Sequence, residues 1–120
     1  MSGTIDFTRA AEFIASVPCG MWTSFGQVAL AAGAEGGAIA IGDWLRRTGD
    51  TVPNVYRVLT VDGRVAQGFA PAGPNVPSDA LTVRELLSRE GVVIDAKGRA
   101  SKQQCFRASD WGRANQPQAG

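Results

Sequence analysis

Apolar residues recur at helical spacing in four stretches of the chain, each followed by a residue that ends helices. The first pattern begins at Asp6 or Thr8, either of which can cap it, and Pro18 and Gly20 then stop it. Gly33 and Gly91 end the second and fourth patterns. The spacing therefore predicts helices over residues 6–15, 24–32, 37–47 and 81–89. The second and third, joined by the short glycine-containing turn 34–36, have the form of a helix-turn-helix.

Between the third and fourth helices the pattern changes to one typical of strands. Residues 52–61 are rich in Val, Tyr, Leu and Thr, and Asp62-Gly63 predicts a tight hairpin leading into residues 64–66. Residues 70–79 are interpreted as an irregular loop. Residues 92–94 predict one last strand, and Lys97-Gly98-Arg99 a turn. We therefore expect one domain over residues 1–113 and a flexible tail over residues 114–120.

The composition narrows the chemistry that this chain can perform. Its 120 residues include no histidine and two cysteines, Cys19 and Cys105, which lack the spacing of paired metal ligands. A Cys-His or Ser-His-Asp hydrolase is excluded, and we expect no metal and no cofactor. No apolar run approaches the ~20 residues of a membrane span, and the first residues do not look like a secretory signal, so we expect a cytoplasmic protein that binds no membrane.

The net charge is +1, but it is unevenly distributed. Residues 1–50 carry three basic and five acidic side chains, whereas residues 51–120 carry nine basic and six acidic ones. The two parts therefore have net charges of −2 and +3. This difference is too mild to identify a partner, although it permits a local basic face.

Four stretches of the sequence carry a resemblance to a known family. They read Val17-Pro18-Cys19-Gly20-Met21-Trp22-Thr23-Ser24-Phe25-Gly26-Gln27-Val28-Ala29, Ala38-Ile39-Ala40-Ile41-Gly42-Asp43-Trp44-Leu45-Arg46, Tyr56-Arg57-Val58-Leu59 with Asp62-Gly63-Arg64-Val65, and Leu86-Leu87-Ser88-Arg89-Glu90-Gly91-Val92. Over roughly residues 7–95 their order and spacing resemble the C-terminal, DNA-binding domain of the alkylguanine-DNA alkyltransferases and the alkyltransferase-like proteins. The resemblance implies an α/β fold, mostly helical with short strands, built as a single winged helix-turn-helix domain of the alkyltransferase C-terminal type.

The departures from the family motif decide what the resemblance implies about activity. In the family the active site reads Pro-Cys-His-Arg-Val, and the cysteine accepts the alkyl group. In this chain Val55 occupies the position of the nucleophilic cysteine, and Tyr56 occupies the position of the histidine. A valine side chain cannot attack carbon, so we expect no enzyme. Only Glu90 remains of the relay that activates the thiolate, and we interpret its role as structural.

The alkyltransferase-like branch also lacks the cysteine, and its members bind the lesion and flag it for excision repair. The resemblance therefore implies a non-catalytic protein that recognises alkylated or otherwise modified guanine through the minor groove. The expected partners are double-stranded DNA and a repair-pathway protein, and the expected state is a monomer. The expected DNA contacts are Phe25, Gln27, Ala38, Ile39, Ala40, Arg46, Arg47 and Arg57. Val55, Tyr56 and Phe69 would form the base pocket.

Two of the residues with which members of the family flip bases are replaced in this chain. Ile39 replaces the arginine finger, and Phe25 replaces the tyrosine of the Thr-Tyr-Gly motif. An isoleucine can wedge between base steps but cannot hydrogen-bond the orphaned base. Ile39 is thus either a wedge or a residue packed against the domain. Tyr56 either stacks on an extruded base or fills the empty pocket, and we favour the second.

Other residues leave similar alternatives open. Arg46, Arg47, Arg57 and Arg64 either contact phosphates or belong to a solvated surface. The basic residues between Lys97 and Arg113 form either an additional contact or a solvated tail, of which we favour the tail. Trp22 and Trp44 are predicted to lie in the core, and Cys105 is predicted to be a buried or half-buried thiol. The alternative function is a protein-interaction or regulatory module without base flipping, and an enzyme of another kind has little support.

Overall fold

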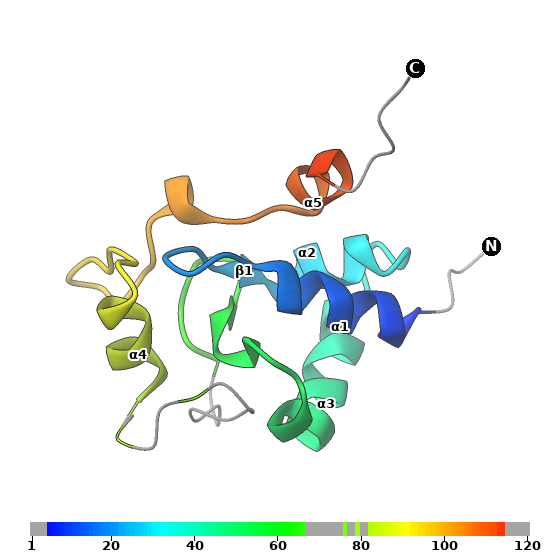
Figure 1. Ribbon diagram of the computed structural model, residues 1–120, viewed down its shortest axis with the longest axis horizontal. Coiled ribbons are helices and arrows are strands. Elements are labelled where there is room, and N and C mark those ends of the chain that lie inside the picture. Colours follow the sequence, from blue (N-terminus) through cyan, green and yellow to red (C-terminus); the bar gives the residue numbers. More distant parts are fainter. Residues whose placement is uncertain (1–4, 67–75, 77–78, 80–81, 115–120) are drawn as a thin grey trace.

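The computed structural model describes residues 5–66, 76, 79 and 82–114. These residues form a mixed fold that is dominated by helices and contains a small two-stranded parallel sheet (Figure 1). The elements in chain order are α1 (Phe7–Ser16), β1 (Thr23–Ser24), α2 (Phe25–Ala31), α3 (Ala38–Thr48), η1 (Gly49–Thr51), η2 (Val55–Arg57), β2 (Val58–Leu59), α4 (Val83–Arg89), η3 (Lys102–Gln104) and α5 (Ala108–Ala114).

The four predicted helices are all present, and side chains cap three of them. The Asp6 carboxylate accepts a hydrogen bond from the Arg9 backbone nitrogen at the start of α1. Ser24 and Thr82 accept in the same way at α2 and α4. Each side chain satisfies one of the backbone donors that a helix start leaves unpaired. The helix ends predicted from the apolar spacing are confirmed to within two residues.

The strand predicted over residues 52–61 is mostly wrong. Asn54 adopts a left-handed conformation with φ of 65°, and its carbonyl accepts from the Arg57 nitrogen, so the chain curls into η2. The Asn54 side-chain amide also donates to the Ala15 carbonyl at the end of α1, which fixes the curl. Only Val58 and Leu59 form a strand, and they pair in parallel with Thr23 and Ser24.

The tight turn at Asp62-Gly63 is present, but the described residues 64–66 that follow it form no strand. The Thr60 nitrogen donates to the Arg64 carbonyl, and Gly63 takes a φ of +80°. The strand predicted over residues 92–94 is likewise reduced to a single antiparallel bridge between Ile94 and Ala100. The turn at residues 97–99 is confirmed by the left-handed Gly98. The predicted loop 70–79 falls almost entirely outside the described residues.

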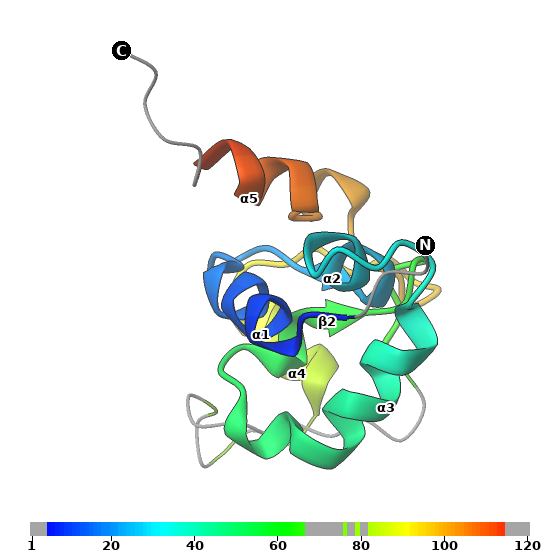
Figure 2. The same cartoon turned by 90° about the vertical axis from the view of Figure 1, so that its right-hand side faces the viewer.

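The C-terminal segment, residues 101–111, is not the solvated tail that the sequence favoured. Its backbone runs beside the residue before β1, where the Trp22 nitrogen donates to the Gln104 carbonyl and the Phe106 nitrogen donates to the Trp22 carbonyl. Figure 2 shows α5 lying over one side of the helical body, next to α2 and α1. Trp111 is buried there against Phe13, with ring centroids 5.4 Å apart. Apolar burial explains why the segment folds onto the domain.

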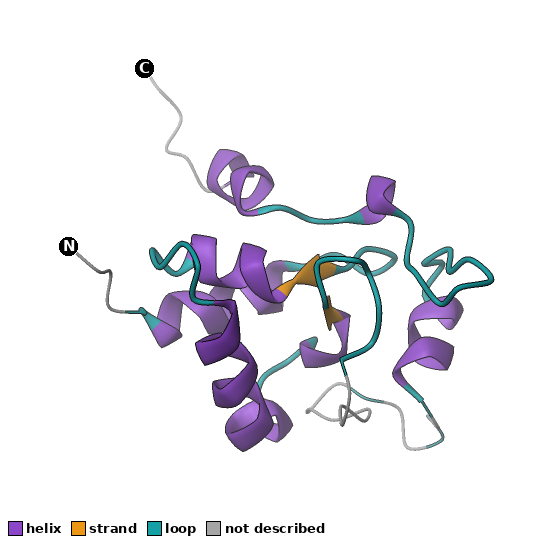
Figure 3. Ribbon diagram, turned by 180° about the vertical axis from the view of Figure 1, so that it is seen from behind, coloured by secondary structure: helices purple, strands orange, loops and turns teal. Residues whose placement is uncertain are grey.

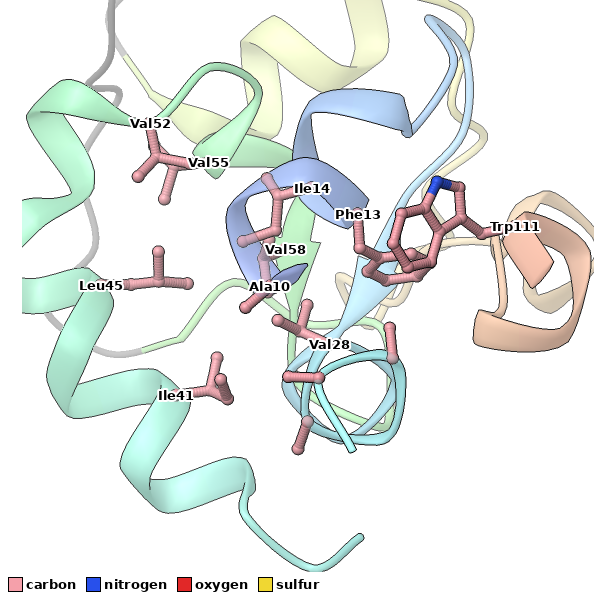
Figure 4. Packing of buried hydrophobic residues seen from close by; sticks show 13 residues of the cluster. Ala10, Phe13, Ile14, Val28, Ile41, Leu45, Val52, Val55, Val58 and Trp111 are labelled. Atoms are coloured by element: carbon pink, nitrogen blue, oxygen red, sulfur yellow. The ribbon is translucent and has the colours of Figure 1, made fainter. Parts of the chain in front are cut away.

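Two hydrophobic clusters hold these elements together. The first joins α1, α2, α3, η2 and α5 and includes Phe13, Val28, Ile41 and Trp111 (Figure 4). The second surrounds the predicted core residue Trp22, which is 1% exposed, and connects α4 to the sheet. Trp44 lies at the edge of the first cluster, half-buried and in contact with Phe7, so its predicted burial is only partial.

Candidate functional site

An open groove lies between α2, α3 and the turn after β2. Its volume is about 470 Å³. Figure 3 shows this side of the molecule, with the loop after β2 between α3 and α4. The groove is lined by Phe25, Gly26, Ala38, Ile39, Gly42, Arg46, Thr60, Val61 and Ala66. We call it the α3 groove.

The exposed apolar side chains of the α3 groove set it apart from ordinary surface. Ile39 is 83% exposed and Val61 is 78% exposed, so neither contributes much to the core. The packed alternative for Ile39 is therefore wrong. Val61 was not among the sequence candidates. The sequence signal that could have identified Val61 is its position next to the Asp62-Gly63 turn, from which an apolar side chain can project.

Helix α3 presents two of its small residues, Ala38 and Ala40, and its basic residues on the outer face. Ile41, Gly42 and Leu45 are buried, whereas Ala40 is exposed and Ala38 lines the groove. The inward residues thus follow helical spacing, which leaves residues 39, 40, 43, 46 and 47 outside.

The two arginines of α3 reach different neighbours. Arg46 lies 3.6 Å from the Asp43 carboxylate and lines the groove. Arg47 is exposed, and its Nε donates to the Asp43 carbonyl. An exposed ion pair of this kind contributes about 0 to 1 kcal/mol, so it restrains Arg46 little.

Arg57, in contrast, is not available to bind DNA. Its side chain is 9% exposed, and its guanidinium donates from Nε to Glu90 Oε1 at 2.9 Å and from Nη2 to Oε2 at 2.7 Å. Nη1 donates to the Val17 carbonyl at 2.8 Å. Although burial opposes the charge, the bonds to Glu90 leave the pKa of Arg57 raised. The prediction of Arg57 as a phosphate contact is wrong because its side chain is buried and held by the Glu90 carboxylate, and Glu90 has the structural role expected of it.

The residues predicted to form a base pocket are turned into the protein. Tyr56 is 2% exposed and Val55 is 3% exposed. The Tyr56 hydroxyl donates to Glu90 Oε2, and burial, followed by this hydrogen bond, raises its pKa to about 12. Tyr56 therefore fills space, which is the alternative that we favoured. The third pocket residue, Phe69, lies outside the described residues.

Gln27, another predicted contact, faces a second hollow instead of the α3 groove. This hollow has a volume of about 250 Å³ and is lined by Trp22, Ser24, Gln27, Val61, Lys102, Cys105 and Arg107. We call it the Lys102 hollow. Cys105 is half-buried there, as predicted, and burial raises the pKa of its thiol. Of the predicted DNA contacts, Phe25, Ala38, Ile39 and Arg46 meet in the groove, and Gln27 and Arg57 do not.

Within the described parts of the chain, no three His, Cys, Asp or Glu side chains are placed so that they could hold a metal ion. Over the same residues, no helix is both long and apolar enough to cross a membrane. No protein-family model and no curated protein matches this sequence. The candidate site is therefore defined by the chain's own geometry.

Proposed function

We propose that this chain is a non-catalytic DNA-binding protein that docks on duplex DNA through α3. In this proposal α2, α3 and the turn at residues 60–66 act as a winged helix-turn-helix that enters the minor groove. The observation that carries the proposal is the position of Ile39, which is 83% exposed at the mouth of the α3 groove. The exposure of such a large apolar side chain to water is explained if Ile39 inserts as a wedge between base steps of DNA.

The residues around Ile39 support docking through their small size and their positive charge. Ala38 and Ala40 are small, so a DNA backbone can come close to the start of α3. Arg46 and Arg47 lie further along the same helix and supply positive charge for phosphates. Phosphate contacts hold the protein on DNA without reading its sequence, whereas a wedge favours steps that unstack easily.

The more specific form of the proposal comes from the resemblance alone. It assigns to the protein the recognition of alkylated or otherwise modified guanine, in the cytoplasm, as a monomer that flags lesions for a repair-pathway protein. The buried positions of Val55 and Tyr56 offer no open surface to a base. Recognition of a modified guanine would therefore depend on how Ile39 distorts the duplex or on a rearrangement around Tyr56.

Fluorescence anisotropy with two labelled duplexes tests the proposal. One duplex is plain and the other contains an alkylated guanine, and each is titrated at two salt concentrations. We expect salt-dependent binding by the wild type and weaker binding by Ile39→Ser and by Arg46→Gln/Arg47→Gln. Val93→Ser is the matched control for Ile39, because Val93 is 64% exposed but lies outside the α3 groove. Absence of binding at low salt would refute DNA docking, and equal affinity for both duplexes would refute lesion recognition.

A second function, docking of a protein partner, is favoured by the apolar character of the same groove. Ile39 and Val61 are both exposed there, and the chain's net charge is only +1. An apolar patch bordered by polar residues is typical of protein interfaces. Under this reading Ile39→Ser abolishes partner binding, whereas Arg46→Gln/Arg47→Gln changes it little, so the two variants separate the two functions.

A further inference from the structure

The Lys102 hollow gathers hydrogen-bond donors from three separate parts of the chain. Gln27 comes from α2, Lys102 from η3, and Arg107 from the residues just before α5. The C-terminal segment is held in place beside Trp22 by backbone hydrogen bonds, and the Thr23 hydroxyl donates to the Phe106 carbonyl at 2.7 Å. The donors therefore lie on an anchored segment of the fold.

The charge of the Lys102 hollow is positive and is not balanced by its own lining. No carboxylate is among the described residues that line it. Within the described residues, the side chains of Lys102 and Arg107 form no ion pair. The nearest acid along the chain, Asp110, accepts a hydrogen bond from the Arg107 backbone nitrogen at 2.9 Å. Because burial raises the pKa of the Cys105 thiol, this residue adds no negative charge near neutral pH.

Lys102 also borders a third hollow, which does contain acids. Asp62, Asp95 and Arg99 line it together with Lys102. Asp95 is already engaged there, because its carboxylate accepts from Arg99 Nε at 3.3 Å and from the backbone nitrogens of Lys97 and Arg99. Among the described residues, the Lys102 ammonium forms no ion pair with Asp95 or with Asp62.

The side chain of Gln27 is oriented by a single hydrogen bond. Its Oε1 accepts from the Ala108 backbone nitrogen at 2.8 Å. This bond uses the acceptor end of the amide, and Nε2 forms no hydrogen bond with any described residue. An amide nitrogen has two donor positions, so Gln27 can donate to an anionic oxygen in the same hollow as the two cations.

Val61 connects the Lys102 hollow to the α3 groove, because it lines both of them. We propose that the Lys102 hollow binds a backbone phosphate of the same DNA that docks on α3, with Lys102, Arg107 and Gln27 as the donors. The interface then runs from α3, across the turn at Val61, onto the C-terminal segment. This inference rests on the proposed function and adds a second contact region to it.

The test measures how DNA binding depends on salt for the variant Lys102→Gln/Arg107→Gln. Each phosphate that a protein neutralises adds about 0.9 to the slope of log affinity against log salt. Because the hollow is proposed to bind one phosphate, loss of this contact should lower the slope by about 0.9 and raise Kd about tenfold at ~0.1 M salt. Lys102→Arg/Arg107→Lys keeps both charges and should keep the wild-type slope.

A matched control removes two charges elsewhere. Arg84 and Lys97 are exposed and form no ion pair with a described residue, and neither lines the groove or the hollow. Arg84→Gln/Lys97→Gln therefore changes the net charge equally and should shift the slope by less than half as much. Thermal unfolding of each variant verifies that all of them fold.

The outcomes separate the failure of this inference from the failure of the proposed function. If the wild type binds DNA and Ile39→Ser weakens it, but Lys102→Gln/Arg107→Gln matches the control, the inference is wrong and docking on α3 stands. If the wild type binds no DNA, both are wrong. In a separate experiment, inorganic phosphate is titrated into the protein and the indole NH signal of Trp22 is followed by NMR. Saturation by millimolar phosphate without any DNA binding would mean that the hollow holds a free anion, which also overturns the inference.

Discussion

The buried pair of Arg57 and Glu90 is expected to be the most sensitive charged contact in the described part of the fold. Both Glu90 oxygens accept from the guanidinium, and the Tyr56 hydroxyl donates to Oε2 as well. The side chains are 9% and 13% exposed. In Glu90→Gln the shape is kept, but one oxygen becomes an NH₂ group that faces donors, and the Arg57 charge stays buried without its counter-ion.

The expected cost follows from this burial. Removal of one partner from a buried ion pair destabilises a protein by about 3 to 5 kcal/mol, because the remaining charge is not compensated. Unfolding entropy of about 2.1 cal/mol/K per residue means that each kcal/mol lowers Tm by about 4 °C in a chain of 120 residues. Glu90→Gln should therefore lower Tm by about 12 to 20 °C.

Urea unfolding followed by circular dichroism measures the free energy, and a thermal scan measures Tm. The control is Asp79→Asn, which breaks an ion pair of 3.1 Å with Arg89 on the surface. Because these side chains are 71% and 43% exposed, that change should cost less than about 1 kcal/mol. A loss below about 1 kcal/mol for Glu90→Gln would refute the reasoning.

A triple variant separates the loss of charge balance from the loss of contacts. Arg57→Met, Glu90→Leu and Tyr56→Phe together remove every member of the cluster, and the Val17 carbonyl keeps the Asn54 amide as a donor at 3.4 Å. Replacement of a buried pair by apolar groups is often neutral or stabilising. The triple variant should therefore be more stable than Glu90→Gln. The opposite order would mean that contacts, and not the unpaired charge, account for the loss.

Three further predictions concern residues around the same fold. Tyr56 is the only tyrosine, so tyrosinate absorbance should report its pKa alone, about 12 in the folded protein and about 10 in urea. Because folding raises the pKa of Tyr56, the contribution of its hydroxyl to stability is complete below pH 10 and is lost as the pH rises towards 12. In Tyr56→Phe the stability should no longer fall over this pH range for this reason. Gly63→Ala should cost about 2 to 4 kcal/mol in urea unfolding, since its Cβ would lie 2.9 Å from the Ala100 carbonyl oxygen. Gly33→Ala has the same φ of +80° but open space, so it should cost only about 1 to 2 kcal/mol, and equal losses would contradict the steric argument. Trp111→Ala should cost about 3 to 5 kcal/mol, and a change under 1 kcal/mol would show that the C-terminal segment does not contribute to the core.

The helices could be predicted from the sequence because their signals are local. Asp6, Ser24 and Thr82 each cap a helix three residues before the backbone nitrogen that they satisfy. Capping and apolar spacing depend on neighbours within one or two turns, which a sequence displays directly. The strands could not be located in the same way. Residues 52–61 contain β-favouring side chains, but the left-handed Asn54 and its bonds to α1 depend on a segment 39 residues away.

The candidate site was predictable in part for a related reason. The resemblance implied that Phe25, Ala38, Ile39 and Arg46 are contacts, and they meet in the groove because they come from two neighbouring helices. Arg57 was misassigned because an arginine within a predicted strand looks like a surface residue until its partner is known. That partner, Glu90, is 33 residues away in sequence. Long-range pairing of this kind leaves no trace in the local pattern.

The contrast between the buried residues 55–57 and the exposed α3 groove limits where a ligand can bind. Val55, Tyr56 and Arg57 are all buried, and the polar groups of the last two are bound to Glu90. Reopening this cluster would have to break a buried ion pair, at a cost of several kcal/mol. Ile39, in contrast, is exposed without any rearrangement. A ligand can therefore bind at the α3 groove without any rearrangement of the protein. A ligand that binds beside Tyr56 must first supply the energy that breaks the ion pair of Arg57 and Glu90.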